Sequence, residues 1–201
     1  LSTSPECLIV PVTFWSFFQT SEDHYQRWAY ANFIRVVRLL AYLTALLAPG
    51  IYIGLSYYHA ELLPTDLLLS ITAARELVPF PVIFEVLIME IAFELIREAG
   101  SRIPTALGST ISIVGALILG QAAVQAGIIS PILIIVVSLT GLSSFAIPET
   151  SSNYMVRITR FIFLFSGATM GFLGIAAFLT ICIAYLTTVK SFEVPFLSPV
   201  A

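Results

Sequence analysis

Long apolar runs separated by short polar turns are the feature that most constrains this chain. The first runs from residue 36 to residue 58, and at 1.5 Å per residue a helix of this length crosses a hydrocarbon core of roughly 30 Å. Hydrophobic residues make up 58% of the sequence and charged residues only 10%, whereas soluble domains contain about 25% charged residues. These values exclude an ordinary soluble domain and predict an all-α transmembrane bundle.

The rest of the sequence predicts further helices of different lengths. They are a short segment at 66–77, a helix with several acidic residues at 82–98, two apolar helices at 106–128 and 131–147, and a last long run at 161–186. We expect four to five spans, with 66–77 as a short interfacial helix and the two apolar helices forming a tight antiparallel hairpin. The predicted organisation is a juxtamembrane segment at 1–35, interfacial or strand-like, that ends a preceding cytosolic domain, a transmembrane domain at 36–188 and a Pro-rich segment at 189–201.

The distribution of basic residues favours five crossings over four. With five crossings, one side of the membrane carries Arg27, Arg35, Arg38, Arg97, Arg102, Arg157 and Arg160, and the other side carries Arg75 and Lys190. Cytoplasmic loops are rich in Lys and Arg, so the first side is expected to be cytoplasmic. If 82–98 were only re-entrant, Arg157 and Arg160 would move to the other side and most of this asymmetry would be lost. Five crossings would leave the end of the chain outside.

The helix at 82–98 places four glutamates in a sequence of Leu, Ile, Phe and Val. On an insertion scale each strongly apolar residue contributes ~0.3 to 0.6 kcal/mol, and a central charged residue costs ~2.5 to 3.5 kcal/mol. The two contributions nearly cancel, so the helix needs protein neighbours, a water-filled cavity or protonated carboxyls. At 100° per residue Glu90 and Glu94 share a face with Arg97 and Glu98, whereas Glu85 points about 140° away from Glu90.

Two interpretations of this acidic face compete. Copies of the helix around an axis would form carboxylate rings that conduct cations, with Glu90 and Glu94 as the main candidates for the ion path and Glu85 as a secondary one. Alternatively, Glu94 and Glu98 pair with Arg97, Arg102 or another helix and fix the packing. The first is favoured because ionisable residues inside a membrane are usually functional, but for Glu98, at the helix end, the second is favoured. Pro79 and Pro81, which precede the helix, predict a hinge.

Small residues predict where helices approach one another closely. Gly108, Ser112, Ala116 and Gly120 recur every four residues, and Gly167 with Gly171 forms a second pair with the same spacing. Such stripes let two helices pack closely within one chain or between copies.

Motifs for catalysis or metal binding are not found in the sequence. The two histidines, His24 and His59, have no metal-ligand spacing, and we find neither a nucleophile motif nor a phosphate-binding loop. The net charge of −3 gives no basic face for nucleic acid. We therefore expect no enzyme activity, no cofactor, no metal and no nucleic-acid partner.

Several long stretches resemble a known family. They are PVTFWSFFQTSEDHYQRW at 11–28, ARELVPFP at 74–81, SIVGALILGQAAVQAGIISPILIIVV at 112–137 and SFEVPFLSPV at 191–200. They are similar to the membrane domain of the A subunit of GerA-type spore germination receptors, and the resemblance covers essentially the whole chain. It implies a multi-pass protein of the inner spore membrane, assembled with a transporter-like B subunit and a lipoprotein C subunit. It also implies a homo-oligomeric, nutrient-gated cation channel.

Three other functions stay open at this stage. The chain could be a non-conducting scaffold that relays nutrient binding, or a carrier that binds substrate through the carboxylates of each monomer. The accessory germination protein of the dipicolinate-release system shares the same motifs and is the third alternative.

Overall fold

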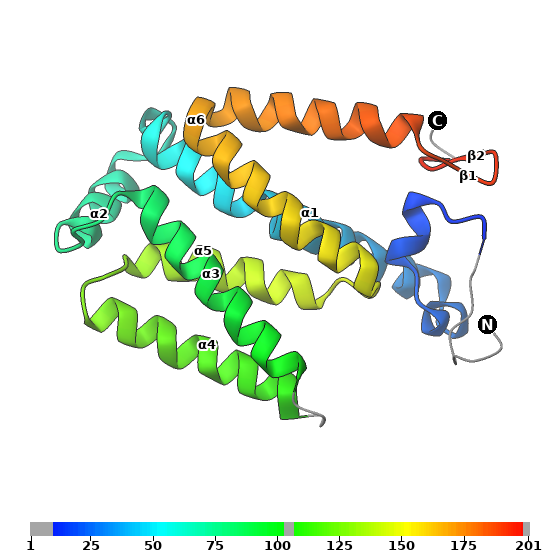
Figure 1. Cartoon of the computed structure of the whole chain (residues 1–201), viewed down its shortest axis with the longest axis horizontal. Helices are drawn as coiled ribbons and strands as arrows, with labels where there is room; N and C mark the ends of the chain where they lie inside the picture. Colours follow the sequence, from blue (N-terminus) through cyan, green and yellow to red (C-terminus); the bar gives the residue numbers. More distant parts are fainter. Residues whose placement is uncertain (1–9, 103–106, 199–201) are drawn as a thin grey trace.

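The computed structural model describes residues 10–102 and 107–198, which form α-helices, short 3-10 turns and one small hairpin. The helices are α1 (Trp28–Tyr57), α2 (Thr65–Arg75), α3 (Val82–Ser101), α4 (Leu107–Gln125), α5 (Pro131–Phe145) and α6 (Thr150–Thr188), as labelled in Figure 1. The predicted all-α fold is confirmed. Residues 1–9 and 199–201 of the predicted terminal segments, and the first residue of the predicted helix 106–128, lie outside the described residues.

The segment before α1 forms two 3-10 turns, η1 (Phe14–Phe18) and η2 (Ser21–Tyr25), and not a strand. Its aromatic rings pack against α1: the ring centroids of Phe14 and Phe18 lie 6.1 and 5.4 Å from that of Tyr42. Phe18 is buried at 2% exposure, so this segment is anchored by side-chain burial and not by sheet pairing.

Helices α1 and α6 pack closely because glycines face each other at their crossing. A Cβ on Gly50 would lie 2.8 Å from the carbonyl oxygen of Phe163, and one on Gly167 would lie 2.6 Å from that of Gly50. Both distances are shorter than carbon and oxygen tolerate, so only glycine allows this approach. Gly167, which the sequence places in a pair of small residues, lies at this crossing.

Helix α6 is two helical segments joined by a sharp reversal at Gly171. The backbone there has φ 60° and ψ −138°, a conformation that essentially only glycine adopts. The rings of Phe163 and Phe178 lie 4.7 Å apart, although fifteen residues of continuous helix would separate them by about 22 Å. The expected single run at 161–186 is therefore a helical hairpin, with segments at 150–170 and 172–188 (Figure 1).

A tyrosine from the end of α1 completes this reversal. The Tyr58 hydroxyl donates to the carbonyl oxygens of Ala168 at 3.0 Å and Thr169 at 2.7 Å. These carbonyls belong to the last turn before the break, where helical acceptors lose their partners. The side chain of Tyr58 also packs against Gly171, since a Cβ there would lie 3.0 Å from the Cβ of Tyr58.

The two ends of the described chain lie together. The backbone N–H of Phe14 donates to the carbonyl oxygen of Phe196 at 2.8 Å, and that of Val12 donates to Ser191 Oγ at 3.2 Å. Ser191 and Phe196 lie in and beside the hairpin of β1 (Lys190–Ser191) and β2 (Val194–Pro195). Figure 1 shows the blue segment before α1 and the red hairpin of β1 and β2 at the same end of α1, because the reversal at Gly171 returns the chain to its starting side.

Helices α4 and α5 form a looser pair than the sequence predicts. They meet at the end near their turn, where a Cβ on Gly120 would lie 3.4 Å from the side chain of Ile134. Farther from the turn α4 packs on α3, since Ser112 Oγ donates to the carbonyl oxygen of Ile96 at 3.3 Å. The turn itself contains Gly127 at φ 66°, and Ser130 caps α5 by accepting from the N–H of Leu133.

Two helices in the described residues are long and apolar enough to cross a membrane by length and composition: α1, and α6 when its two segments are counted together as Thr150–Thr188. They share an apolar core with Ala45 and Leu46 on α1 and Phe163 and Ile175 on α6. A second core of α1, α3 and α5 includes Ile53, Val86 and Leu133. The acidic helix α3 is thus built into the bundle through its apolar face.

Candidate functional site on the acidic helix

The start of α3 is set by the two prolines predicted as a hinge. Residues 78–81 are not helical, and Pro81 is the N-cap with an extended ψ of 148°. Proline favours the first positions of a helix and keeps its predecessor extended, so α3 cannot join α2 without a break.

Glu90 forms the most deeply buried ion pair of the site. Its carboxylate oxygen Oε2 lies 3.0 Å from Nη2 of Arg160, on the first segment of α6. Glu90 is 0% exposed and Arg160 is 2% exposed. Breaking a buried pair by removing one partner costs about 3 to 5 kcal/mol, because the remaining charge is left without compensation. This pair therefore ties α3 to α6 inside the bundle.

Glu94, one turn farther along α3, contacts three arginines. Its Oε2 lies 3.6 Å from Nη2 of Arg160 and 3.9 Å from Nη1 of Arg97, and its Oε1 pairs with Nη2 of Arg157. The Glu94 side chain is 25% exposed and borders a groove of about 560 Å³ between α3 and α6, whose lining includes Glu98 and Phe165. Unlike Glu90, it is accessible from outside the chain.

Glu85 lies at the other end of α3 and has different partners. It is 1% exposed, its Oε1 lies 3.3 Å from Nη2 of Arg75 on α2, and its Oε2 accepts from the backbone N–H of Ser130 at 3.1 Å. These contacts join α2 and the α4–α5 turn to the first turn of α3, where a carboxylate also interacts favourably with the helix dipole. The sequence indicated a separate direction for Glu85, and its contacts are separate.

The structure gives the acidic helix protein neighbours, one of the three environments that the sequence allowed. Sequence reasoning missed the main partners, Arg157 and Arg160, which it assigned to a polar connection before the last span. Their spacing of three residues was the available signal, since residues three apart lie on one face of a helix. Glu98 and Arg102, by contrast, form the predicted local pair, with Nη2 of Arg102 at 2.9 Å from Oε1 of Glu98.

The stripe of small residues on α4 does not face a single helix. Gly108 and Ser112 lie against the end of α3, since a Cβ on Gly100 would approach the carbonyl oxygen of Gly108 to 2.8 Å. Ala116 lines a cavity between α3, α4 and α5, and Gly120 faces α5. Gly171, the second member of the other predicted pair, provides the reversal of α6.

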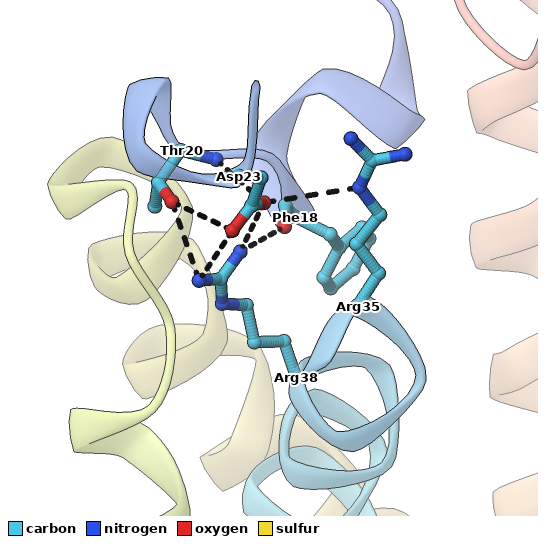
Figure 2. Close-up of polar contacts among 5 residues, drawn as sticks. All are labelled: Phe18, Thr20, Asp23, Arg35 and Arg38. Carbon is cyan, nitrogen blue, oxygen red and sulfur yellow. Dashed lines mark hydrogen bonds and ion pairs between the residues drawn. The ribbon is translucent and has the colours of Figure 1, made fainter. Parts of the chain in front are cut away.

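A second charged cluster fixes the segment before α1, and Figure 2 shows how its side chains converge. Arg38 Nη1 donates to Asp23 Oδ2 at 2.7 Å and to the carbonyl oxygen of Phe18 at 2.8 Å, and its Nη2 donates to Asp23 Oδ1 at 3.1 Å. The N–H of Thr20 donates to Asp23 at 3.1 Å, and Arg35 Nε lies 3.8 Å from the same carboxylate. The hydrogen bonds from Arg38 lower the pKa of Asp23 to about 2.

A metal centre is not found among the described residues, in which no group of three or more His, Cys, Asp or Glu side chains converges. The polar chemistry of the described chain is that of carboxylates paired with guanidinium groups. Such an arrangement can hold helices together, and it can bind or pass ions when the pairs separate.

Comparison with known proteins shows what kind of protein contains this acidic helix. The sequence matches the family described as Bacillus/Clostridium GerA spore germination protein over residues 1–201. The chain belongs to the GerA family. The predicted resemblance to the A subunit of GerA-type receptors is thereby confirmed.

The GerA relatives are longer than this chain. It is 47% identical to spore germination protein KA of Bacillus subtilis (strain 168) over 98% of this chain and 36% of that protein. It is 45% identical to spore germination protein A1 of the same organism over 99% of this chain and 41% of that protein. It is also 44% identical to the uncharacterized membrane protein YfkQ, over 98% of this chain and 39% of that protein. The chain therefore spans about two-fifths of their length. No solved structure matches it.

Proposed function

We propose that this chain is the membrane domain of the A subunit of a nutrient-responsive germination receptor, and that copies of it form a cation channel. Membership of the GerA family supports the receptor assignment. We place the protein in the inner spore membrane, with a transporter-like B subunit and a lipoprotein C subunit as partners. The channel is the finer part of the proposal, and it rests on the carboxylates of α3.

One observation carries the channel proposal: α3 holds two carboxylates inside an apolar bundle, and arginines of another helix neutralise them. Glu90 is fully buried against Arg160, and Glu94 contacts Arg157 and Arg160. Intramembrane charges of this kind are costly and commonly mark ion pathways. We interpret the paired arrangement as a closed state. Separation of α3 from α6 would free carboxylates that attract cations.

Glu94 is the first residue that such a movement would expose. It is a quarter exposed in the groove between α3 and α6, whereas Glu90 lies behind it. In an assembly of several copies, one α3 from each around an axis would bring the Glu94 carboxylates into a ring. Pro79 and Pro81 would provide the hinge, because the break they impose separates α3 from α2. Glu85 stays a secondary candidate, and its contacts with Arg75 and Ser130 favour anchoring.

The test is cation flux through the full-length protein, reconstituted into liposomes with its partner subunits. Glu94→Gln removes the exposed carboxylate, so we expect triggered flux to fall at least about tenfold, the effect of about 1.4 kcal/mol on an ion barrier. Arg157→Gln removes one of the three arginine partners of the same carboxylate, so flux without nutrient should rise. Glu61→Gln, on the exposed turn η3 (Ala60–Leu62), is the matched control and should change neither value.

A non-conducting scaffold is the second candidate function. It is favoured by the same ion pairs, since arginines that neutralise both carboxylates also suit a rigid element that relays a signal. A scaffold predicts no flux through purified protein with any ligand, and no effect of Arg157→Gln on flux. Either result, obtained with protein that assembles normally, would contradict the channel.

A further inference from the structure

A partly open cavity of about 160 Å³ lies between α3, α4 and α5, where α4 diverges from α5. Its lining includes Phe93, Leu117, Leu142, Phe145, Ser138 and Arg97. An engineered apolar cavity of about 150 Å³ takes up benzene, so this one has room for part of an acyl chain. The family assignment and the ion pairs on α3 leave this cavity without a role.

Arg97 provides one charged group at the edge of this apolar space. Its side chain is 12% exposed, Nη1 makes no hydrogen bond, and its nearest carboxylate oxygen in an ion pair is 3.9 Å away. The cluster that contains it has three guanidinium groups (Arg97, Arg157, Arg160) and two carboxylates (Glu90, Glu94), which leaves one positive charge in excess. The guanidinium also lies 5.3 Å from the ring of Phe145.

The cavity is polarised in the same direction as a lipid. Arg97 is four residues, about 6 Å, from the end of α3, which is the depth of the head groups for a helix that ends at the membrane surface. Phe93 and Leu117 lie at least one turn farther from the ends of their helices, so this part of the lining, which also includes Ser138 in the middle of α5, lies deeper than Arg97. The mouth is bordered by exposed apolar residues, Ile113, Leu117 and Leu142, at 46–59% exposure. An occupant therefore enters from the bilayer and not from water.

We infer that this cavity binds one acyl chain of an anionic phospholipid, with the lipid phosphate at Arg97. A guanidinium group suits a phosphate because its N–H groups match the geometry of two phosphate oxygens. Basic pockets between transmembrane helices are a known mode of anionic lipid recognition. The rest of the lipid lies along the exposed surface of α4 and α5. This inference does not depend on whether the protein conducts ions.

The test compares two lipids that differ only in head-group charge. The full-length protein is reconstituted into nanodiscs of equimolar phosphatidylglycerol and phosphatidylcholine that carry identical acyl chains. The protein is then released from the nanodiscs, and the lipid molecules that stay bound to it are counted by native mass spectrometry. We expect phosphatidylglycerol to be enriched about fivefold, which corresponds to one nearby cation. Arg97→Gln should abolish the enrichment. Arg102→Gln, at the exposed end of the same helix, should leave it intact.

A second pair of variants tests the cavity itself. Ala116→Leu fills the space and should lower retention of both lipids, whereas Ala122→Leu, on the exposed surface of the same helix, should not. Because Ala116→Leu alters no charge, it remains informative if Arg97→Gln fails to fold. Equal retention of the two lipids by the unmodified protein would overturn the inference. An equal loss of phosphatidylglycerol enrichment in Arg97→Gln and Arg102→Gln would also overturn the inference. If the protein retains no lipid and Ala116→Leu disrupts an oligomer, the cavity is instead a contact site for a second copy of the chain, and the inference is overturned.

Discussion

Protonation of Asp23 should control whether the segment before α1 stays packed against the helices. It accepts hydrogen bonds from Arg38 and Thr20, and its pKa is lowered to about 2 from an ordinary value of 3.8. A carboxyl with a lowered folded-state pKa stabilises the fold fully above its unfolded pKa and progressively less as pH falls toward the folded pKa. The cluster should therefore hold the segment before α1 at neutral pH and release it between about pH 4 and pH 2.

Asp23→Asn should release the same segment at pH 7. It removes the charge that Arg38 binds, and trypsin cleavage after Arg27 should accelerate severalfold relative to the unmodified protein. In the unmodified protein, pepsin cleavage within η1 should rise steeply below about pH 4, and this step should be absent from the variant. Asp66→Asn, at the exposed start of α2, is the control. Unchanged trypsin cleavage in Asp23→Asn would show that ring packing alone holds the segment.

At the residue scale, the sequence predicts which charges are unusual but not what they meet. The spacing of Glu90 and Glu94, and the separate direction of Glu85, follow from helical geometry alone. The partners Arg157 and Arg160 are about 65 residues away, and no local pattern specifies which helix face will lie against α3. Because an unpaired charge in a membrane is energetically costly, these carboxylates need partners, but the identity of the partner residues depends on the fold.

At the element scale, the sequence predicts five of the six helices in the described residues closely and misses the form of the sixth. Apolar runs and the Pro and Gly residues between them place α1 to α5 to within a few residues, apart from the early start of α1. Helix α6 begins at Thr150, before the predicted 161, and its polar first turns are helical where Val156 and Arg160 are buried in the bundle. The break at Gly171 has no local signal, since glycine within an apolar run is common in membrane helices.

The reversal of α6 gives a prediction about Gly171. Gly171→Ala adds a Cβ 3.0 Å from the side chain of Tyr58 at a φ of 60°, so we expect a loss of about 1 to 3 kcal/mol in the free energy of unfolding. Thermal unfolding of the detergent-solubilised protein, followed by circular dichroism, measures the change. Gly115→Ala is the matched control: its Cβ would make an ordinary 3.6 Å contact with Ile96, and it should leave stability unchanged or raise it by up to about 1 kcal/mol. Equal stability of the two variants would show that the detergent-solubilised protein lacks the reversal at Gly171.

At the scale of the whole molecule, the hydrogen bond between Phe14 and Phe196 gives a prediction about the number of membrane crossings. We expect the two segments that it joins to lie outside the bilayer and on one side of it, so that the chain between them crosses an even number of times. This differs from the five crossings predicted from the sequence, which leave the end of the chain outside. The reversal at Gly171 accounts for the difference, because it turns one predicted span into two segments of opposite direction (Figure 1).

The charge distribution agrees with an even number of crossings. With an even number of crossings, Lys190 is expected on the side of Arg27 and Arg102, and of the basic residues in the described chain only Arg75 is expected on the other side. The positive-inside rule therefore predicts that both ends of the membrane domain are cytoplasmic.

Single cysteines test this prediction in intact cells that express the full-length protein without its other cysteines. Glu61→Cys should react with a membrane-impermeant maleimide, whereas Glu22→Cys and Glu193→Cys should react only after the cells are permeabilised. Reaction of Glu193→Cys in intact cells would instead indicate an odd number of crossings. It would also mean that the contact between Phe14 and Phe196 does not form in the membrane-embedded protein.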